Sequence, residues 1–312
     1  MFSFLSILLF LILVPILIKI VPTFYLRYKR KVTNVREKYN CEYALVTGAS
    51  TGVGFAVCDL LASQGIKVIL VSRSEERLEI AKKKLLEKHP NGSFIVKPID
   101  LGQDGSVVSE TLEREFGDYN ISMVFNNAGY NVPWRLEEVE WSKAQTMLNC
   151  NVVAYAAVSH WFLNKWKTQR KGNERAAVVF TSSGASYLPT GLYTELYSSA
   201  KSFVSMFAQS FGIRARKFGI DIIDIQTGPV KSEFLKRAGF ESLKESMSSA
   251  QDPSIVAKMM LNGIGKFYSI DQHWSVCIMQ LVSQYLGANA LCLLSRFMPQ
   301  DLHRKKDKQK EN

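Results

Sequence analysis

The stretch Tyr43–Gly54 reads YALVTGASTGVG, and it decides the fold. It joins a short apolar run, residues 43–47, to a glycine-rich turn at which a helix is expected to begin. Glycine lets the backbone turn tightly and approach a phosphate closely, and the free N–H groups of a helix N-terminus favour anions. The spacing T-G-x-x-x-G-x-G predicts a turn that binds the pyrophosphate of a dinucleotide through Gly48, Ser50, Thr51, Gly52, Val53 and Gly54. For this stretch taken alone, an ordinary tight turn between strand and helix is the alternative.

Beyond this turn, short apolar runs alternate with stretches of helical length and composition. The runs lie at residues 43–47, 67–72, 93–100, 121–126, 176–181 and 219–225. Strands that alternate with helices predict a parallel sheet with helices on both faces, and right-handed crossovers then give a doubly wound (Rossmann) fold of the α/β class. Ligands are expected at the carboxyl ends of the strands. The length suits a single domain at residues 41–270.

The end of the second run indicates which dinucleotide is bound. An acid at this position usually binds the ribose 2′-hydroxyl of NAD, whereas this chain has Ser72-Arg73-Ser74. A planar guanidinium matches the geometry of a phosphate, so Arg73 predicts binding of the 2′-phosphate of NADP(H). A solvent-exposed loop arginine is the alternative.

Tyr197 and Lys201, in the segment YSSAK, form a second candidate site. On a helix, residues i and i+4 lie on one face, so the phenol and the ammonium can share one small volume. A nearby cation lowers the pKa of a phenol from its reference of about 10, which makes it a usable proton donor near neutrality. A surface pair is the default for this spacing in isolation. Here, however, the pair opens a long helix that follows an apolar run ending in Thr181-Ser182-Ser183.

In this order and spacing, the motifs resemble those of the short-chain dehydrogenase/reductase family over about residues 43–268. The matching elements are the glycine turn at 47–54, Asp100 after the third run, Asn126-Asn127-Ala128-Gly129 after the fourth, Asn151 in a long helix, a serine after the fifth run, and Tyr-x-x-x-Lys. Asp100 or Asn151 alone would be a strand-end cap or a polar packing residue. Taken together, the motifs are highly specific.

The resemblance implies a role for each matching residue. Tyr197 is expected to be the catalytic acid, while Lys201 lowers its pKa and holds the nicotinamide ribose. Ser183 is expected to bind the substrate carbonyl, and Asn151 to hold a water that links Lys201 to bulk solvent. The remaining cofactor contacts are expected from Asp100 at the adenine, from Asn126, Ala128 and Gly129 in the groove, and from Gly228, Val230 and Ser232 near the carboxamide. Ser183 lies fourteen residues before Tyr197 rather than the family's usual thirteen, so Ser182 stays an alternative.

Charge and cysteine content exclude several kinds of site. The formal net charge is +11, but residues 27–31 contribute +4 of it and residues 304–312 another +3, so the middle of the chain is only mildly basic. A nucleic-acid-binding protein needs a continuous positive face, so no nucleic-acid partner is expected. The five cysteines are widely spaced and the four histidines are isolated, which predicts neither a disulfide framework nor a metal site.

Residues 1–26 predict a transmembrane anchor. The first eighteen carry no charge, and as a helix they would span about 27 Å of a hydrocarbon core about 30 Å thick. They lack the basic start and the small-residue cleavage site of a signal peptide. The basic linker 27–40 follows, and positive flanks favour the cytosol, so the catalytic domain is expected there. Pro15 and Pro22 leave a kinked, interfacial helix as the alternative.

Residues 271–312 are predicted to form an apolar, membrane-associated helix and a basic tail. Gln280, Gln284 and Asn289 interrupt the apolar stretch 274–298, which suits an interfacial helix better than a second crossing. Lys308 and Lys310 resemble a cytosolic dilysine signal for retrieval to the endoplasmic reticulum. A charged, solvated tail is the alternative.

The substrate is expected to contact residues 231–249, which take the place of the family's substrate lid. Their apolar side chains would form a wall for an acyl chain or a sterol, or else pack an amphipathic helix. These side chains are Phe234, Leu235, Phe240, Leu243 and Met247.

The anchor, the apolar C-terminal extension and the YSSAKSFVSMFAQSF helix most resemble the branch of very-long-chain 3-oxoacyl-CoA reductases and 17β-hydroxysteroid dehydrogenases. This resemblance implies NADPH-dependent reduction of a ketone on a long-chain lipid at the endoplasmic reticulum membrane, with a 3-oxoacyl-CoA as the first choice, and pairing into a homodimer. The alternatives are a 17β-hydroxysteroid, 3-ketodihydrosphingosine or a retinoid. A catalytically idle, cofactor-bound membrane scaffold is a distant alternative, because both Tyr197 and Lys201 are present.

Overall fold

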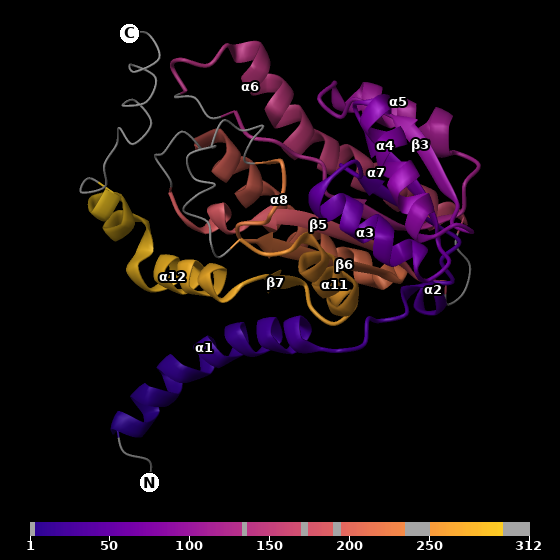
Figure 1. Ribbon diagram of the computed structural model, residues 1–312. Helices are drawn as coiled ribbons and strands as arrows, with labels where there is room; N and C mark the ends of the chain where they lie inside the picture. Colours follow the sequence, from indigo (N-terminus) through magenta and orange to yellow (C-terminus); the bar gives the residue numbers. More distant parts are fainter. Residues whose placement is uncertain (1–3, 133–135, 170–173, 190–194, 235–249, 296–312) are drawn as a thin grey trace.

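Parallel strands alternate with helices along the chain in the computed structural model, which describes residues 4–132, 136–169, 174–189, 195–234 and 250–295. Within these ranges, seven strands form one parallel sheet in the order β3-β2-β1-β4-β5-β6-β7 (Figure 1). They are β1 (Tyr43–Thr47), β2 (Lys67–Ser72), β3 (Phe94–Pro98), β4 (Ile121–Asn126), β5 (Ala176–Ser183), β6 (Ile220–Thr227) and β7 (Ser269–Asp271). The predicted doubly wound α/β fold is confirmed. The sequence did not predict β7, because three residues are too few to give a pattern.

Helices cover both faces of the sheet and enclose two cores. One face is covered by α3 (Gly52–Ala62), α4 (Glu75–Lys88) and α11 (Pro253–Gly263), and the other by α5 (Gly105–Phe116), α7 (Ala154–Gln169) and α8 (Glu195–Ala215). Successive side chains of a strand point to opposite faces, so Val46 lies in the first core and Leu45 in the second. Because both faces are covered, the strands read as continuous apolar runs.

Shorter helical elements connect these layers, most of them near the carboxyl ends of the strands, whereas η3 (Arg216–Phe218) precedes β6 at its amino end. These elements are α6 (Trp141–Leu148), the π-helical turn η1 (Asn149–Val153), and the 3₁₀ turns η2 (Gly184–Tyr187) and η3. The turn η1 joins α6 to α7 without a loop, and η2 follows β5 directly. Both turns carry or adjoin residues for which the sequence predicts a function.

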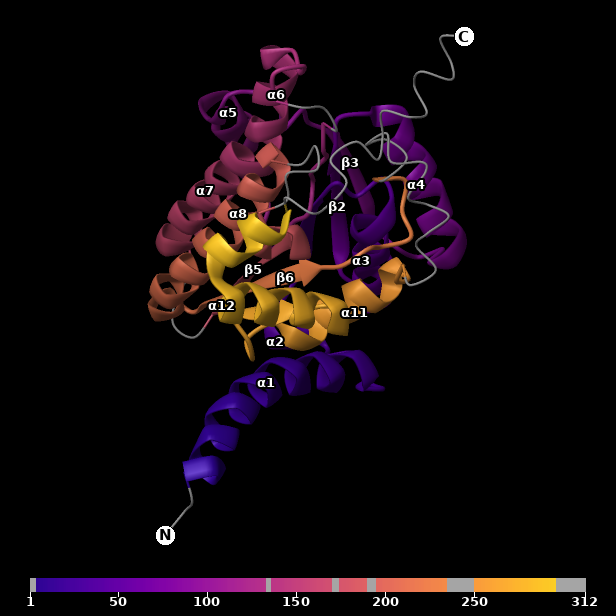
Figure 2. The same ribbon diagram turned by 90° about the vertical axis from the view of Figure 1, so that its left-hand side faces the viewer.

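The N-terminal helix α1 (Phe4–Tyr28) projects away from the sheet, and its last turns lie under α11 and β7 (Figure 2). The hydroxyl of Thr23 donates a hydrogen bond of 2.7 Å to the backbone oxygen of Asp271, and Leu26 is fully buried. The basic segment that follows is also packed, since it contains α2 (Val35–Lys38) and the buried Tyr39. The transmembrane anchor at residues 1–26 and the domain boundaries stay predictions.

The C-terminal helix α12 (Trp274–Ser295) begins directly after β7. Residues 274–294 are long and apolar enough to cross a membrane by length and composition, with a mean hydropathy of 1.4. The helix is interrupted at Gly287, whose φ of 71° and ψ of 165° are not helical. Its first turn is anchored in the domain through the buried Val276 and Cys277, whereas Trp274 and Ile278 are exposed.

Candidate active site

The glycine turn between β1 and α3 depends on its glycines for two different reasons. Gly48 and Gly52 have φ of 66° and 60°, a region that disfavours residues with a Cβ. Gly54 is required for space, because a Cβ added there would lie 2.3 Å from the backbone oxygen of Gly48. The turn is thus folded tightly upon itself at the carboxyl end of β1.

The N-terminus of α3 faces the same turn. Thr51 is its N-cap residue, and its side chain makes no capping hydrogen bond within the described part of the chain. The first N–H groups of a helix have no partner within the helix and favour an anion. Ser232 lies across from this turn, since a Cβ on Gly52 would be 3.1 Å from the Cβ of Ser232. Ser50 and Val53 are half-buried in the turn, so all the residues predicted to hold the pyrophosphate lie together.

The loop after β4 is tied to the glycine turn through Asn127 rather than Asn126. The Thr47 hydroxyl accepts hydrogen bonds from the backbone N–H of Asn127 at 2.9 Å and of Ala128 at 3.0 Å. The Asn127 amide group donates to the Thr47 backbone oxygen at 3.2 Å and accepts from the Thr181 hydroxyl at 3.2 Å. Asn126 was predicted to line the cofactor groove. Its side chain instead donates to Ser159 at 3.3 Å in the interior, so Asn127 is the residue that sequence reasoning missed.

Lys201 lies on the face of α8 that packs against β5 and is almost fully buried. Its ammonium donates a hydrogen bond of 2.9 Å to the backbone oxygen of Thr181 at the carboxyl end of β5. It lies 5.8 Å from the ring centroid of Tyr197 and 5.1 Å from that of Tyr155. Burial lowers the pKa of Lys201 to about 8, because a charged ammonium loses hydration there.

Tyr197 and Ser183 meet at this position, and their side chains are hydrogen-bonded. Burial raises the pKa of Tyr197 to about 12, and the hydrogen bond with Ser183 opposes this rise. The sequence predicts that Lys201 lowers the pKa of this phenol, whereas in the structure burial is the largest influence and raises it. The Ser182 hydroxyl donates to the backbone oxygen of Lys201 at 2.8 Å and is buried. Of the two adjacent serines, Ser183 is therefore the one beside the phenol.

Asn151 sits in the π-helical turn η1 and fixes the loop after β4. Its amide nitrogen donates to the backbone oxygen of Tyr130 at 2.7 Å, and its oxygen accepts from the backbone N–H of Tyr130 at 3.2 Å. Gly129 lies between the two predicted groups, since a Cβ there would be 2.5 Å from the Asn151 oxygen and 3.4 Å from the Lys201 nitrogen. The structure thus brings Asn151, Gly129 and Lys201 together.

The remaining predicted cofactor residues surround this centre at the carboxyl ends of their strands. Arg73 is exposed after β2, and Asp100 accepts a hydrogen bond of 2.9 Å from the backbone N–H of Gly102. After β6, the backbone N–H of Gly228 donates to the Gln272 side chain at 3.1 Å. Val230 pairs with Gln251 in an isolated bridge. The loop after β6 is held beside β5, because the Thr227 hydroxyl donates to the Ser182 backbone oxygen at 2.8 Å.

Two apolar side chains border the catalytic groups. The ring of Phe234 lies 5.7 Å from that of Tyr197, centroid to centroid. Val276 of α12 lies against the turn after β5 and the loop after β6, since Cβ atoms added at Gly184 and Gly228 would be 3.1 and 3.2 Å from its methyl groups. The other residues predicted for an apolar wall, Leu235, Phe240, Leu243 and Met247, lie outside the described residues, as do Lys308 and Lys310.

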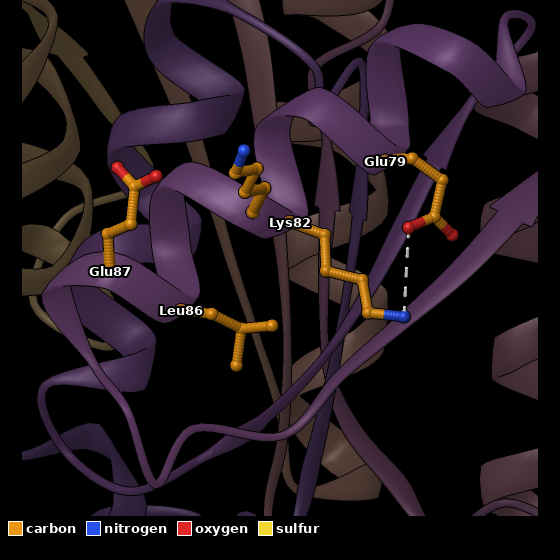
Figure 3. A pocket seen from close by; sticks show the side chains of 5 residues that line it. Glu79, Lys82, Leu86 and Glu87 are labelled. Carbon is orange, nitrogen blue, oxygen red and sulfur yellow. Dashed lines mark ion pairs between the residues drawn. The ribbon is translucent and has the colours of Figure 1, made fainter.

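A shallow hollow on α4 is separate from this site (Figure 3). It is lined by Glu79, Lys82, Lys83, Leu86 and Glu87, with an ion pair of 3.8 Å between Lys82 and Glu79. These are successive turns of one surface helix, and the hollow shares no residue with the candidate active site.

The chain belongs to the short-chain dehydrogenase family, because the model of that family matches residues 42–241. It is 31% identical over 193 residues to 17-beta-hydroxysteroid dehydrogenase type 3 of Danio rerio, which covers 60% of this chain and 59% of that one. It is 27% identical over 197 residues to a very-long-chain 3-oxoacyl-CoA reductase-like protein of Arabidopsis thaliana, 61% of this chain and 60% of the relative. The predicted family is thus confirmed, and proteins of the predicted branch are among its relatives.

Two further comparisons bear on activity and fold. The inactive hydroxysteroid dehydrogenase-like protein 1 of Homo sapiens is 25% identical over 259 residues, 80% of this chain and 76% of that one. A solved short-chain dehydrogenase from Sphingobium yanoikuyae in complex with NADPH superposes with a TM-score of 0.65 at 20% identity, and covers 83% of this chain and 97% of that one. At this identity, the likeness to the solved structure supports the fold alone.

Proposed function

We propose that this protein is a membrane-bound, NADP(H)-dependent oxidoreductase that reduces a ketone on a long-chain lipid. The observation that carries the proposal is the convergence of Tyr197, Ser183 and Lys201 at the carboxyl ends of the strands, next to the tight glycine turn. A phenol, a hydroxyl and an ammonium at this position suit proton transfer to a carbonyl oxygen. They have no evident use in a purely structural role, because burying an ammonium is costly.

The residues present fit a dinucleotide cofactor. The turn at Gly48 and Gly54 has no space for a Cβ, the N-terminus of α3 offers free N–H groups, and Arg73 offers a fork-shaped cation for a 2′-phosphate. Asp100 would stand near the adenine, and the loop at Gly228, Val230 and Ser232 would hold the carboxamide. The NADPH bound to a structural relative agrees with this assignment. When bound, the nicotinamide supplies hydride to the carbonyl carbon of the substrate.

The chain's own groups would complete the reaction by managing the proton. Tyr197 donates its phenolic proton to the carbonyl oxygen as negative charge develops there. Ser183 donates a hydrogen bond to the same oxygen, the electrostatic task of an oxyanion-stabilising group. The Lys201 ammonium stabilises the phenolate that results. Asn151 holds the loop after β4 and, in this proposal, a water through which Lys201 exchanges protons with solvent.

The relatives support the substrate class. Phe234 and Val276 give the site an apolar border, which suits a hydrocarbon better than a sugar or a small acid. One relative is named for a ketone on a long acyl chain, as a very-long-chain 3-oxoacyl-CoA reductase-like protein, and another for a steroid alcohol, as a 17-beta-hydroxysteroid dehydrogenase, whose oxidised partner is a ketone. A 3-oxoacyl-CoA is our first choice, and a 17-ketosteroid, 3-ketodihydrosphingosine or retinal are the alternatives.

The membrane association rests on α1 and α12. These two helices contact each other, and their exposed side chains include many large apolar residues. Among them are Phe10, Leu17, Ile18 and Val21 on α1, and Trp274, Ile278, Val282 and Tyr285 on α12. Exposed apolar patches of this kind mark membrane or protein contacts. We place α1 across the endoplasmic reticulum membrane and α12 in its cytosolic interface, so that the helix bordering the active site also contacts the lipid that supplies the substrate.

Pairing into a homodimer is also proposed, through α7 and α8. On α8, the apolar side chains of Met206 and Ile213 are 66% and 75% exposed. They lie two helical turns apart on one face, which suits a contact with a second copy of the chain. Light scattering of the detergent-solubilised protein should report a dimer, and Met206→Glu should convert it to a monomer.

The experiment that tests the function is NADPH oxidation by the detergent-solubilised protein against 3-oxoacyl-CoAs, ketosphinganine, 17-ketosteroids and retinal. We expect turnover of at least one ketone by the wild-type protein and its loss in Tyr197→Phe, with NADPH binding retained. Near-normal turnover in Tyr197→Phe would refute the assigned role.

The second candidate is a cofactor-bound but catalytically idle membrane protein. The observation in its favour is the similarity to a relative named as an inactive hydroxysteroid dehydrogenase-like protein. It predicts NADPH binding without turnover of any ketone by the wild type. The presence of both Tyr197 and Lys201 favours the enzyme.

A further inference from the structure

A buried carboxylate, Asp224, lies in the middle of β6 behind the catalytic lysine. Its side chain is fully inaccessible and faces α8. One carboxylate oxygen accepts hydrogen bonds from the Ser205 hydroxyl at 2.9 Å and from the Gln226 amide at 2.6 Å. The other oxygen has no hydrogen-bond partner among the described residues. An acidic group in this position is costly unless it has a compensating charge or a function.

The hydrogen bonds of Asp224 connect the two elements that carry the catalytic groups. Ser205 follows Lys201 by four residues on α8, so both side chains project from the same face of that helix. Gln226 accepts a hydrogen bond of 2.9 Å from the Ser186 hydroxyl in η2, the turn directly after Ser183. The chain of contacts from Ser205 through Asp224 and Gln226 to Ser186 therefore holds η2 and α8 in register.

Among the charged groups that act on Asp224, the positive one is Lys201, which projects from α8 one turn before Ser205. The titratable groups that face Asp224 are Lys201 from α8, Asp271 from β7, Tyr187 from η2 and Tyr155 from α7. Of these, Lys201 alone carries a positive charge. Burial raises the pKa of Asp224 to about 7, and the hydrogen bonds from Ser205 and Gln226, followed by the charge of Lys201, oppose that rise. In the reverse direction, burial lowers the pKa of Lys201, while Cys150 of η1 and then Asp224 oppose the fall.

We propose that Asp224 is a positioning residue of the active site that acts through Lys201. Its carboxylate keeps the lysine protonated in a dry interior, and its hydrogen bonds to Ser205 and Gln226 hold the turn after Ser183 against the catalytic helix. The proposal deepens the proposed function and rests on it for the meaning of Lys201. The electrostatic coupling between the two side chains can nevertheless be measured without any substrate.

The test compares two substitutions on the same strand. Asp224→Asn removes the buried charge and keeps the size of the side chain. The matched control is Asp221→Asn, the same chemical change at the start of β6. Asp221 accepts hydrogen bonds there from Tyr39 at 2.7 Å and from Arg175 at 2.6 Å. In the full chain in detergent, lysine labelled with ¹³C at Cε is followed by NMR through a pH titration, and the Lys201 resonance is assigned by its absence in Lys201→Arg.

Loss of a negative charge disfavours the ammonium, so the titration midpoint of Lys201 should fall. We expect a fall of about half a pH unit or more in Asp224→Asn, because an opposite charge favours the ammonium, and no change in Asp221→Asn. Equal midpoints in wild type and Asp224→Asn would overturn the proposal. If Asp224→Asn does not fold, Asp224→Ser, which also removes the carboxylate, should give the same fall.

A second readout separates this proposal from the proposed function. With the ketone that the wild type reduces, the alkaline limb of kcat/KM should move to lower pH in Asp224→Asn and stay in place in Asp221→Asn. If Tyr197→Phe keeps full turnover, the proposed function fails, while a shifted Lys201 midpoint still establishes the coupling. If Tyr197→Phe is inactive and the Lys201 midpoint does not move, only the role of Asp224 fails.

Discussion

The two halves of the sheet build their parts of the candidate active site in different ways. In the half formed by β1 to β3, the backbone does most of the work: Gly48 and Gly52 adopt positive φ, and Gly54 leaves no space for a side chain. In the half formed by β4 to β7, buried side chains from several elements converge, with Lys201 from α8 and Asp224 from β6 among them. The proposed nucleotide-binding turn is thus a local property of the chain, whereas the proposed catalytic centre is assembled from distant segments.

The largest effect in the first half of the sheet is expected from Gly54→Ala, which disturbs the glycine turn. The new Cβ would lie 2.3 Å from the Gly48 backbone oxygen, so the turn must open. We expect the Kd for NADPH to rise about tenfold or more, a loss of about 1.4 kcal/mol or greater. NADPH fluorescence titration measures it. Gly287→Ala is the control for backbone strain alone: its φ of 71° also disfavours a Cβ, but no described atom lies within 4 Å of the added Cβ and the position is on α12, away from the turn. Equal affinities in the two variants would contradict the account.

A more selective change in the same half is Arg73→Ala. A charge-assisted hydrogen bond to a phosphate is worth about 1.5–3 kcal/mol, so the Kd for NADPH should rise about tenfold to a hundredfold. The Kd for NADH, which lacks the 2′-phosphate, should stay within about twofold. Parallel titrations with the two nucleotides make this measurement. Equal weakening of both would remove the assignment of Arg73 to the 2′-phosphate.

A third substitution introduces a charge on α12, the helix that we propose lies in the membrane interface, instead of at the candidate active site. Ile278 on α12 is 46% exposed, and Ile80 on α4 is 49% exposed, so Ile278→Glu and Ile80→Glu add the same charge at similar exposure. Charge inserted into a membrane interface is unfavourable. In the full chain in lipid vesicles, a fluorescent probe is attached to the exposed Cys292 and quenched by labelled lipids. We expect this quenching to fall severalfold in Ile278→Glu but not in Ile80→Glu. Unchanged quenching in both would place α12 away from the lipid.

The smallest expected effect is on the pH dependence of stability. Because the pKa of Asp224 rises from 3.8 to about 7 on folding, the native state binds a proton that the unfolded chain has lost between these values. This group therefore stabilises the wild type at low pH, and the contribution is lost as pH rises toward 7. Relative to wild type, the Tm of Asp224→Asn should be a few degrees higher at pH 8 than at pH 5. A pH-independent difference, measured by thermal unfolding in detergent, would contradict the raised pKa.

The fold and the glycine turn could be predicted from the sequence because both depend on patterns of residues that are close together in the chain. Glycines at fixed spacing and alternating apolar runs have direct physical causes in the chain. Sequence reasoning could not choose between Ser182 and Ser183, because adjacent strand residues face opposite sides and the register of the turn decides which one meets Tyr197. For the same reason it named Asn126, whose side chain points into the interior, rather than Asn127.

Other features depended on contacts between distant segments. Asp224 reads as one polar residue within an apolar run, and its position behind Lys201 arises only when β6 packs against α8. The packing of Thr23 against Asp271 joins residues at opposite ends of the chain. The expected fall in the pKa of Tyr197 was outweighed by burial, which a sequence does not quantify.

The central claim is that Tyr197 gives a proton to a ketone that receives hydride from NADPH at this site. Incubation of the solubilised protein with NADPH deuterated at the transferred position, followed by mass spectrometry of the lipid product, tests it directly. The account predicts one deuterium on the new carbinol carbon with the wild type and almost none with Tyr197→Phe, although the variant still binds NADPH. Deuterium transfer at similar rates by both proteins, or by neither with any of the ketones, would contradict it.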